Sequence, residues 1–122
     1  PFAALPRLGL GFNDYAVPAL TAADLPAVRT LGLRANRITT AALVFPTLED
    51  LDLSVNPLAD PAAAVAGCPS LVRLDLGNTG LTDAGLGRLL AVLPPSVRTL
   101  GLAWNPLTDA AAAALAARPG LA

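Results

Sequence analysis

Aliphatic residues recur along this chain in a nine-position pattern that appears five times. In each copy the first, fourth and sixth positions are Leu or Val, the ninth is Asn or Thr, and a bulky, mostly aliphatic residue follows two positions later. Side chains alternate between the two faces of a strand, so the fourth and sixth positions share one face. The pattern therefore predicts five short strands, each with one buried face. The copies span 5–13, 28–36, 48–56, 71–79 and 97–105.

The segments that join the copies vary in length and favour helices in three places. The ninth positions lie 23, 20, 23 and 26 residues apart (13 to 36, 36 to 56, 56 to 79 and 79 to 105). Three segments begin with a helix-capping residue and continue with apolar residues, which predicts a helix in each. The shorter stretch 39–47 contains Pro46 and favours a single helical or 3₁₀ turn. The three helix starts are Asp60-Pro61, Thr82-Asp83 and Thr108-Asp109.

Burial of the repeated leucines requires neighbouring copies to stack. One buried Leu contributes roughly 1.5 to 3 kcal/mol, but a single copy cannot cover its own leucines. The ninth-position Asn can hydrogen-bond backbone groups of adjacent copies that would otherwise be buried without partners. Thr79, which replaces Asn in the fourth copy, can supply only part of this bonding. The chain is therefore predicted to fold as a regular stack whose stability is collective.

The repeated string L-x-x-L-x-L-x-x-N-x-L resembles that of leucine-rich-repeat proteins, and the resemblance covers essentially the whole chain. The longest joining segment, 83–93, is most similar to the ribonuclease-inhibitor-like subclass, with a mixed bacterial and eukaryotic subclass as the alternative. The resemblance implies an α/β fold: a right-handed leucine-rich-repeat solenoid, a curved horseshoe segment with a parallel sheet on its concave face and short helices or 3₁₀ turns on its convex face. Residues 1–122 then form a single domain of about five repeats, with strand starts near 5, 28, 48, 71 and 97. We expect this domain to be part of a longer solenoid or larger protein.

Composition narrows the functional classes. A formal net charge of −1 gives no general attraction to nucleic acid or to an anionic membrane. The longest apolar runs, such as 110–117, are far shorter than the roughly 20 residues needed to cross a bilayer. The chain contains no histidine and no lysine, which removes Ser-His-Asp and Cys-His catalysis, His-based zinc sites and the phosphate-binding G-x-x-x-x-G-K-[ST] loop. We therefore expect no enzymatic activity, no cofactor and no metal site.

The single cysteine, Cys68, cannot form a disulfide within the chain, whereas secreted repeat proteins commonly carry disulfide-bonded caps. This difference favours a reducing, cytoplasmic location. Cys68 stands where a joining segment turns back into the next strand, so we expect its thiol to be buried and unreactive. Tyr15 stands at a position that is aliphatic in the other copies, and we expect it to pack in the interior.

The third, fifth, seventh and eighth positions should face outward on or beside the sheet, so their residues decide what the surface can bind. Asp50, Asp52 and Asp75 form an acidic centre near Arg34 and Arg73. Adjacent parallel strands would place Asp52 and Asp75 about 4.8 Å apart at the backbone, where like charges repel mildly. The centre is either a recognition patch for a basic protein segment or an ordinary solvated surface with local ion pairs. A catalytic carboxylate pair or metal site is disfavoured, because no His, Cys or further carboxylate converges on it.

The eighth position carries bulky apolar residues where the sheet gives way to the loop, and it includes Trp104, the only tryptophan. Tryptophan is enriched among binding hot spots, and it is also a large side chain suited to a core. We favour a contact role for Trp104 over core packing. The residues at this position are Phe12, Ala35, Val55, Asn78 and Trp104.

These observations predict a protein-interaction or scaffolding module that binds a protein or peptide partner on its concave face, as a component of a larger complex. Two alternatives are a substrate-recruiting or regulatory segment of a multidomain enzyme, such as a ubiquitin ligase or GTPase activator, and a structural subunit of a large assembly. We expect neither a nucleic acid nor a membrane as partner. The residues expected to contact the partner are Arg34, Asp50, Asp52, Arg73, Asp75 and Trp104.

Overall fold

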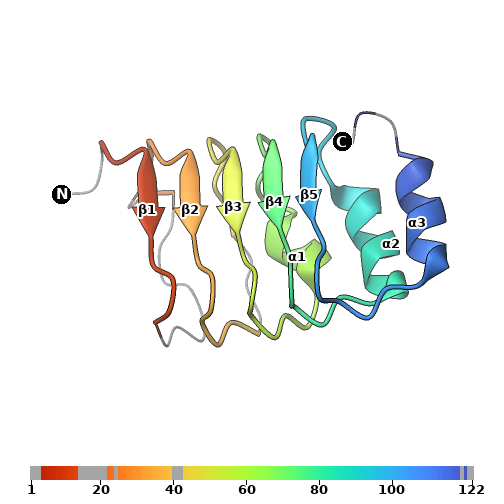
Figure 1. Ribbon diagram of the computed structural model, residues 1–122. Helices are drawn as coiled ribbons and strands as arrows, with labels where there is room; N and C mark the ends of the chain where they lie inside the picture. Colours follow the sequence, from red (N-terminus) through yellow and green to blue (C-terminus); the bar gives the residue numbers. More distant parts are fainter. Residues whose placement is uncertain (1–3, 14–21, 24, 40–42, 119, 121–122) are drawn as a thin grey trace.

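Five short parallel strands form one open sheet in chain order, as the repeated pattern predicted (Figure 1). The computed structural model describes residues 4–13, 22–23, 25–39, 43–118 and 120. Each strand covers only the third to fifth positions of its copy, so it starts two residues later than predicted. The strands pair without a shift in register, with the fourth-position leucines aligned across the sheet. They are β1 (Arg7–Gly9), β2 (Thr30–Gly32), β3 (Asp50–Asp52), β4 (Arg73–Asp75) and β5 (Thr99–Gly101).

Helices begin at the three places that the capping residues indicated. They are α1 (Pro61–Val65), α2 (Asp83–Val92) and α3 (Asp109–Ala116), and α2 packs between the other two (Figure 1). The Thr82 hydroxyl accepts the Gly85 N–H at 3.2 Å, and the Thr108 hydroxyl accepts the Ala110 N–H at 3.3 Å. Asp60 makes no side-chain cap, and α1 instead starts with a proline, whose fixed φ suits the first helical turn.

The single turn predicted within 39–47 lies partly outside the described residues. Its described part, 43–47, contains an isolated parallel bridge between Val44 and Gly67 and a turn at 46–47, with no helix. Tyr15 also lies outside the described residues, so its expected interior position stays a prediction.

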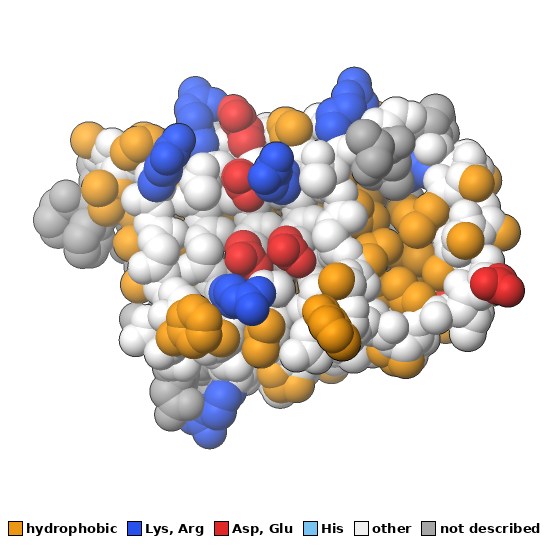
Figure 2. All heavy atoms as spheres, in the orientation of Figure 1, with side chains coloured by type: hydrophobic (Ala, Val, Ile, Leu, Met, Phe, Trp, Pro, Cys, Tyr) orange, Lys and Arg blue, Asp and Glu red, His pale blue; other side chains and the backbone are white. Residues whose placement is uncertain are grey.

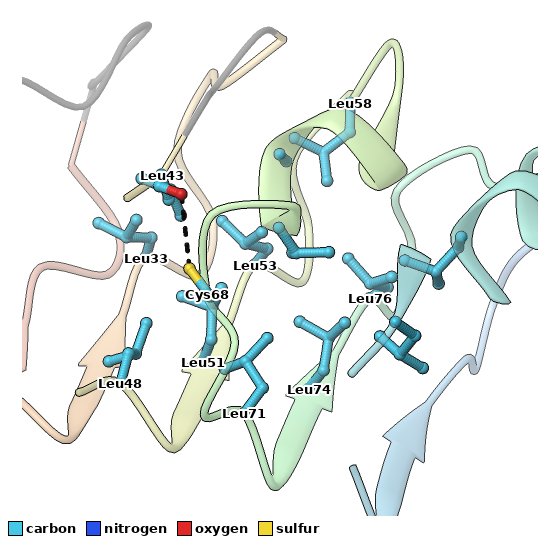
Figure 3. Packing of buried hydrophobic residues seen from close by; sticks show 14 of the residues in the cluster. Leu33, Leu43, Leu48, Leu51, Leu53, Leu58, Cys68, Leu71, Leu74 and Leu76 are labelled. Carbon is cyan, nitrogen blue, oxygen red and sulfur yellow. Dashed lines mark hydrogen bonds between the residues drawn. The ribbon is translucent and has the colours of Figure 1, made fainter. Parts of the chain in front are cut away.

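The core lies between the sheet and the joining segments, and the repeated leucines fill it (Figure 3). In the three central copies, the fourth- and sixth-position leucines are at most 2% exposed. Their equivalents in the first and last copies are partly buried. Cys68 is fully buried in this core, where its Sγ lies 3.5 Å from the Leu43 carbonyl oxygen. Burial raises the pKa of the Cys68 thiol and a backbone hydrogen bond from Phe45 opposes this only in part, as expected for an inert cysteine.

The ninth-position asparagines connect neighbouring copies through their side-chain amides. Asn56 is 1% exposed, and its Nδ2 donates to the carbonyl oxygens of Leu53 in its own copy and Leu33 in the preceding copy, both at 2.9 Å. Its Oδ1 accepts the N–H groups of Asn36 (3.1 Å) and Ile38 (3.2 Å) in the preceding copy. Its Nδ2 also donates to the Ser54 carbonyl oxygen at 3.2 Å, so one amide bonds five backbone groups in two copies. We call this arrangement the asparagine ladder.

Thr79 interrupts the asparagine ladder, as its shorter side chain predicted. Its Oγ1 donates to the Leu76 carbonyl within its own copy at 2.9 Å, and among the described residues it makes no bond to the copy before it. The N–H of Leu58 in that preceding copy therefore bonds the carbonyl of Asn56 at 2.9 Å. Leu107, in the last copy, has the same arrangement at 2.8 Å. The third copy is thus bonded like the end of a stack.

Replacement of Thr79 by asparagine is expected to stabilise the protein. The new amide can donate to the Leu53 carbonyl and accept the Leu58 N–H, as Asn105 does for the equivalent groups one copy later. We expect the free energy of unfolding to rise by about 1 kcal/mol, measured by urea denaturation followed by circular dichroism. The reverse change in the last copy, Asn105→Thr, is the matched control and should destabilise. A Thr79→Asn variant less stable than the parent would contradict the ladder.

Candidate functional site

The exposed face of the sheet is divided into charged and apolar regions. Figure 2, seen from the same side as Figure 1, shows acidic side chains gathered over the middle strands, with basic side chains around them. Hydrophobic side chains lie along the edge where the strands end. The predicted contact residues come from these regions, and the register of the strands decides which of them meet.

The register brings the predicted charged residues together at the centre of the sheet. Asp52 of β3 is aligned with Asp75 of β4, and Asp50 is aligned with Arg73. Neighbouring strands lie about 4.8 Å apart, so Asp52 and Asp75 are like charges on adjacent backbones. We call these two residues the acidic pair. Arg34, from the preceding copy, joins the group because its Nη1 donates to Ser54 Oγ at 2.9 Å.

Local backbone and hydroxyl groups hold the acidic pair in place. Asp52 Oδ1 accepts the Ser54 N–H at 2.9 Å and the Ser54 hydroxyl at 2.5 Å. Asp75 Oδ1 accepts the Gly77 N–H at 2.8 Å. Each aspartate therefore closes a turn two residues after the strand, and the Asp-x-Ser and Asp-x-Gly spacings were sequence signals for this that we did not use. These carboxylates have a structural role in addition to any binding role.

The ion pairs of an ordinary solvated surface are not found at the acidic centre. Within the described ranges, Asp50, Asp52 and Asp75 have no Arg nitrogen within 4.0 Å. An ion pair does form on this face between Arg29 and Glu49, at the edge where the strands begin. The acidic pair is therefore without a compensating ion pair.

Glycines leave the acidic pair without side-chain neighbours in its row. The fifth-position residues, aligned across the sheet, read Gly9, Gly32, Asp52, Asp75 and Gly101. A Cβ added at Gly101 would lie 2.8 Å from Asp75 Oδ1, and one added at Gly77 would lie 3.1 Å from the same oxygen. The carboxylate of Asp75 thus occupies space that two missing side chains leave open.

The eighth-position residues all turn outward on left-handed backbone. Their φ angles are 58° for Phe12, 57° for Ala35, 57° for Val55, 51° for Asn78 and 61° for Trp104. Residues other than glycine rarely adopt this region, and for a β-branched residue such as Val55 it is an outlier. Trp104 is 87% exposed and Phe12 is 80% exposed. The alternative of core packing for Trp104 is therefore wrong, while its contact with a partner stays a prediction.

A hollow of about 380 Å³ joins Trp104 to the charged centre. We call it the Trp104 hollow. It brings together three of the predicted contact residues, Arg34, Asp75 and Trp104, whereas Asp50 and Arg73 line a separate shallow depression near the strand starts. The Trp104 hollow was not evident from the sequence, because it combines residues from different repeat positions of different copies. It is lined by Arg34, Ser54, Val55, Asp75, Gly77, Asn78, Ala103 and Trp104.

The part of the chain that the structure describes contains no group of three or more His, Cys, Asp or Glu arranged to hold a metal ion. None of its helices combines the length and the apolar character that a membrane crossing requires.

Stacked parallel strands, inward leucines and an asparagine ladder are the features of a leucine-rich-repeat protein. A family model described as Leucine Rich repeat matches residues 67–90 and 94–116, which are the fourth and fifth copies with their helices. A Tonsoku-like protein from Danio rerio is 36% identical over 109 residues. The match covers 73% of this chain and 8% of that relative, so the chain corresponds to a small part of the relative's length.

Proposed function

We propose that this chain is a protein-interaction or scaffolding module that binds a protein or peptide segment on its sheet. In this proposal the solenoid is right-handed and ribonuclease-inhibitor-like, with the sheet on its concave face and the helices on its convex face. The partner contacts Arg34, Asp50, Asp52, Arg73, Asp75 and Trp104.

The observation that carries the proposal is the acidic pair. Two carboxylates lie on adjacent strands of an exposed face, and no cation of the described residues pairs with them. A basic group from a partner would relieve their repulsion. Five strands give a sheet roughly 20 to 25 Å across. A sheet of this width can supply part of the roughly 800 Å² that a standard interface buries on each partner. Leucine-rich repeats generally mediate binding to proteins, which supports the same role.

Binding is proposed in place of catalysis. The acidic pair has no histidine or lysine to work with, because the sequence contains neither. Asp52 and Asp75 each use one oxygen to close a local turn, which suits a fixed recognition surface. The proposal includes a cytoplasmic location and membership of a larger complex. A recruiting segment of a larger enzyme, or a structural subunit, would use this surface for the same kind of contact.

The charge of the acidic pair can be removed without removing its hydrogen bonds. An Asp52→Asn and Asp75→Asn double variant keeps the Oδ1 atoms that accept the N–H groups of Ser54 and Gly77. Substitution of the two aspartates by basic residues would break these bonds as well, so a loss of binding could not be separated from a loss of stability. Peptides selected from a displayed random library on the immobilised chain provide the ligands. We expect them to be basic, and we expect the double variant to bind them about tenfold more weakly, a loss of about 1.4 kcal/mol.

The control is Glu49→Gln, which removes a carboxylate from the same face at a residue outside the proposed contact set. This variant should bind the selected peptides as the parent does. The melting temperature of the double variant should stay close to that of the parent, because the turns are kept. The proposal fails if the selected peptides bind the parent and the double variant equally, or if no peptide is selected.

A further inference from the structure

Trp104 is exposed at a position where the backbone gives no structural reason for a large apolar residue. Left-handed backbone is least costly for glycine and is tolerated by asparagine, which stands at the equivalent Asn78. Trp104 adopts it with 87% of its surface exposed. Folding gains little from such a side chain, whereas large aromatic residues are those that most often dominate binding energy. The backbone conformation is shared by all five copies, so it is the exposure of a large aromatic side chain that indicates a contact with another molecule.

The Trp104 hollow offers an apolar wall and a charged rim close together. Trp104 and Val55 supply apolar surface, and Gly77, which is buried, leaves the floor clear of side chains. Asp75 stands on the rim with one oxygen committed to the Gly77 N–H. Its Oδ2 makes no hydrogen bond or ion pair to any described residue. A volume of about 380 Å³ is within the range of roughly 300–1,000 Å³ that is usual for ligand pockets.

The charge around the Trp104 hollow selects a cation. Arg34 is the single cation on the rim, and it donates to Ser54 Oγ, whose hydroxyl is in turn bonded to Asp52. Asp75 is the one carboxylate among its lining residues, and Asp52, which is aligned with Asp75 but is not part of the lining, adds a second carboxylate beside it. A cationic side chain paired with Asp75 would lie in the same hollow as the indole of Trp104, whose face attracts cations.

We propose that the Trp104 hollow is the anchor site for the partner, and that its occupant is a peptide segment in which an apolar side chain stands directly beside an arginine or lysine. The apolar side chain packs against Trp104 and Val55, and the cation pairs with Asp75. This inference rests on the proposed function, and it adds the point of anchorage and the chemistry of the segment. Phe12, at the same repeat position and almost equally exposed, is not among the residues that line the Trp104 hollow and is no part of the site.

Trp104 is the only tryptophan of the chain, so its fluorescence reports directly on binding at this site. A Gly-Ser peptide with a central Leu-Arg pair is titrated into the 122-residue chain while Trp104 emission and acrylamide quenching are recorded. Peptides with Leu-Glu or Ala-Arg in place of Leu-Arg serve as comparisons. We expect the Leu-Arg peptide to shift the emission to shorter wavelength and to protect Trp104 from quenching, the Ala-Arg peptide to do so weakly and the Leu-Glu peptide not at all.

Labelled versions of the same peptides measure affinity independently through fluorescence anisotropy. We expect Trp104→Ala to weaken binding of the Leu-Arg peptide about tenfold, and the matched Phe12→Ala variant to change it less than about twofold. Both variants place alanine on left-handed backbone, so a general effect on stability would appear in both.

The outcomes separate this inference from the proposed function. In one outcome the Leu-Arg peptide binds the parent chain and binds the Asp52→Asn and Asp75→Asn double variant more weakly, but Trp104 emission does not change and Trp104→Ala binds the peptide as well as Phe12→Ala does. The anchor site is then wrong and the proposed function stands. If the Leu-Glu peptide binds as well as the Leu-Arg peptide, the cationic occupant is wrong. If none of the peptides binds the chain, the anchor site is overturned, while library selection remains the test of the proposed function.

Discussion

Replacement of Asn56 by alanine is expected to be among the most destabilising single changes in this protein, costing on the order of 4 kcal/mol. The substitution removes the amide that serves the backbone groups of Leu33, Leu53, Asn36 and Ile38. These groups lie around a residue that is 1% exposed, so water does not readily replace the lost bonds. Unfolding in urea, followed by far-ultraviolet circular dichroism, measures the effect. Tryptophan emission would not serve, because Trp104 is already exposed in the folded chain.

Asn13 provides the matched control for this prediction. It stands at the same ninth position in the first copy, is exposed, and donates to the carbonyls of Leu10 and Gly11 in its own copy. Asn13→Ala should therefore cost less than about 1 kcal/mol. Equal losses for Asn13→Ala and Asn56→Ala would show that bonding between copies does not hold the stack together.

Replacement of Gly67 by alanine is expected to cost about 3 kcal/mol, through crowding of the backbone. The new Cβ would lie 2.5 Å from the Leu43 carbonyl oxygen and 3.1 Å from the Val44 Cα. Gly67 bridges to Val44, and its carbonyl accepts the Phe45 N–H at 3.2 Å, so the joining segments cannot separate without losing these contacts. Because the obstacle is backbone, no side-chain rotation relieves it. The same urea unfolding measurement gives the loss.

Gly87 is the control of opposite sign. It is an exposed residue within α2, and a Cβ added there meets nothing within 4 Å. Gly87→Ala should stabilise the protein by roughly 0.5–1 kcal/mol, because glycine is the poorer helix former. If both glycine variants shift stability in the same direction, close contact with the backbone of 43–44 is not the reason that glycine is needed at position 67.

The repeated leucines and asparagines made the fold predictable, because their spacing is a direct consequence of strand geometry. Five copies aligned without gaps, and the structure places all five strands within them. The left-handed backbone at the eighth position was not predictable, since Phe12, Val55 and Trp104 are residues that rarely adopt it. The conformation is set by the turn that each copy repeats, and the side chain follows.

The charged surface was predictable in part. Strand register follows from the leucine pattern, so the adjacency of Asp52 with Asp75 was predicted correctly, and the same register aligns Asp50 with Arg73. Register fixes backbone positions and leaves long side chains free, and no ion pair forms between Asp50 and Arg73. Holding two exposed side chains in one geometry costs entropy that such pairs scarcely offset. The Trp104 hollow could not be read from the pattern, because it combines residues from different repeat positions of different copies.

The interruption of the asparagine ladder at Thr79 removes one set of side-chain bonds between the third and fourth copies, while the backbone bonds between β3 and β4 continue. Each ladder asparagine bonds back to the copy before it, whereas Thr79, in the fourth copy, makes no such bond to the third copy among the described residues. Asp52 and Asp75 lie on opposite sides of this joint. A segment that binds both carboxylates would therefore bridge the joint at which this side-chain bonding is missing, and we expect it to slow hydrogen exchange at the Leu58 amide. Asp52 and Asp75 would then serve both to recognise the partner and, through the bound segment, to connect the third copy to the fourth.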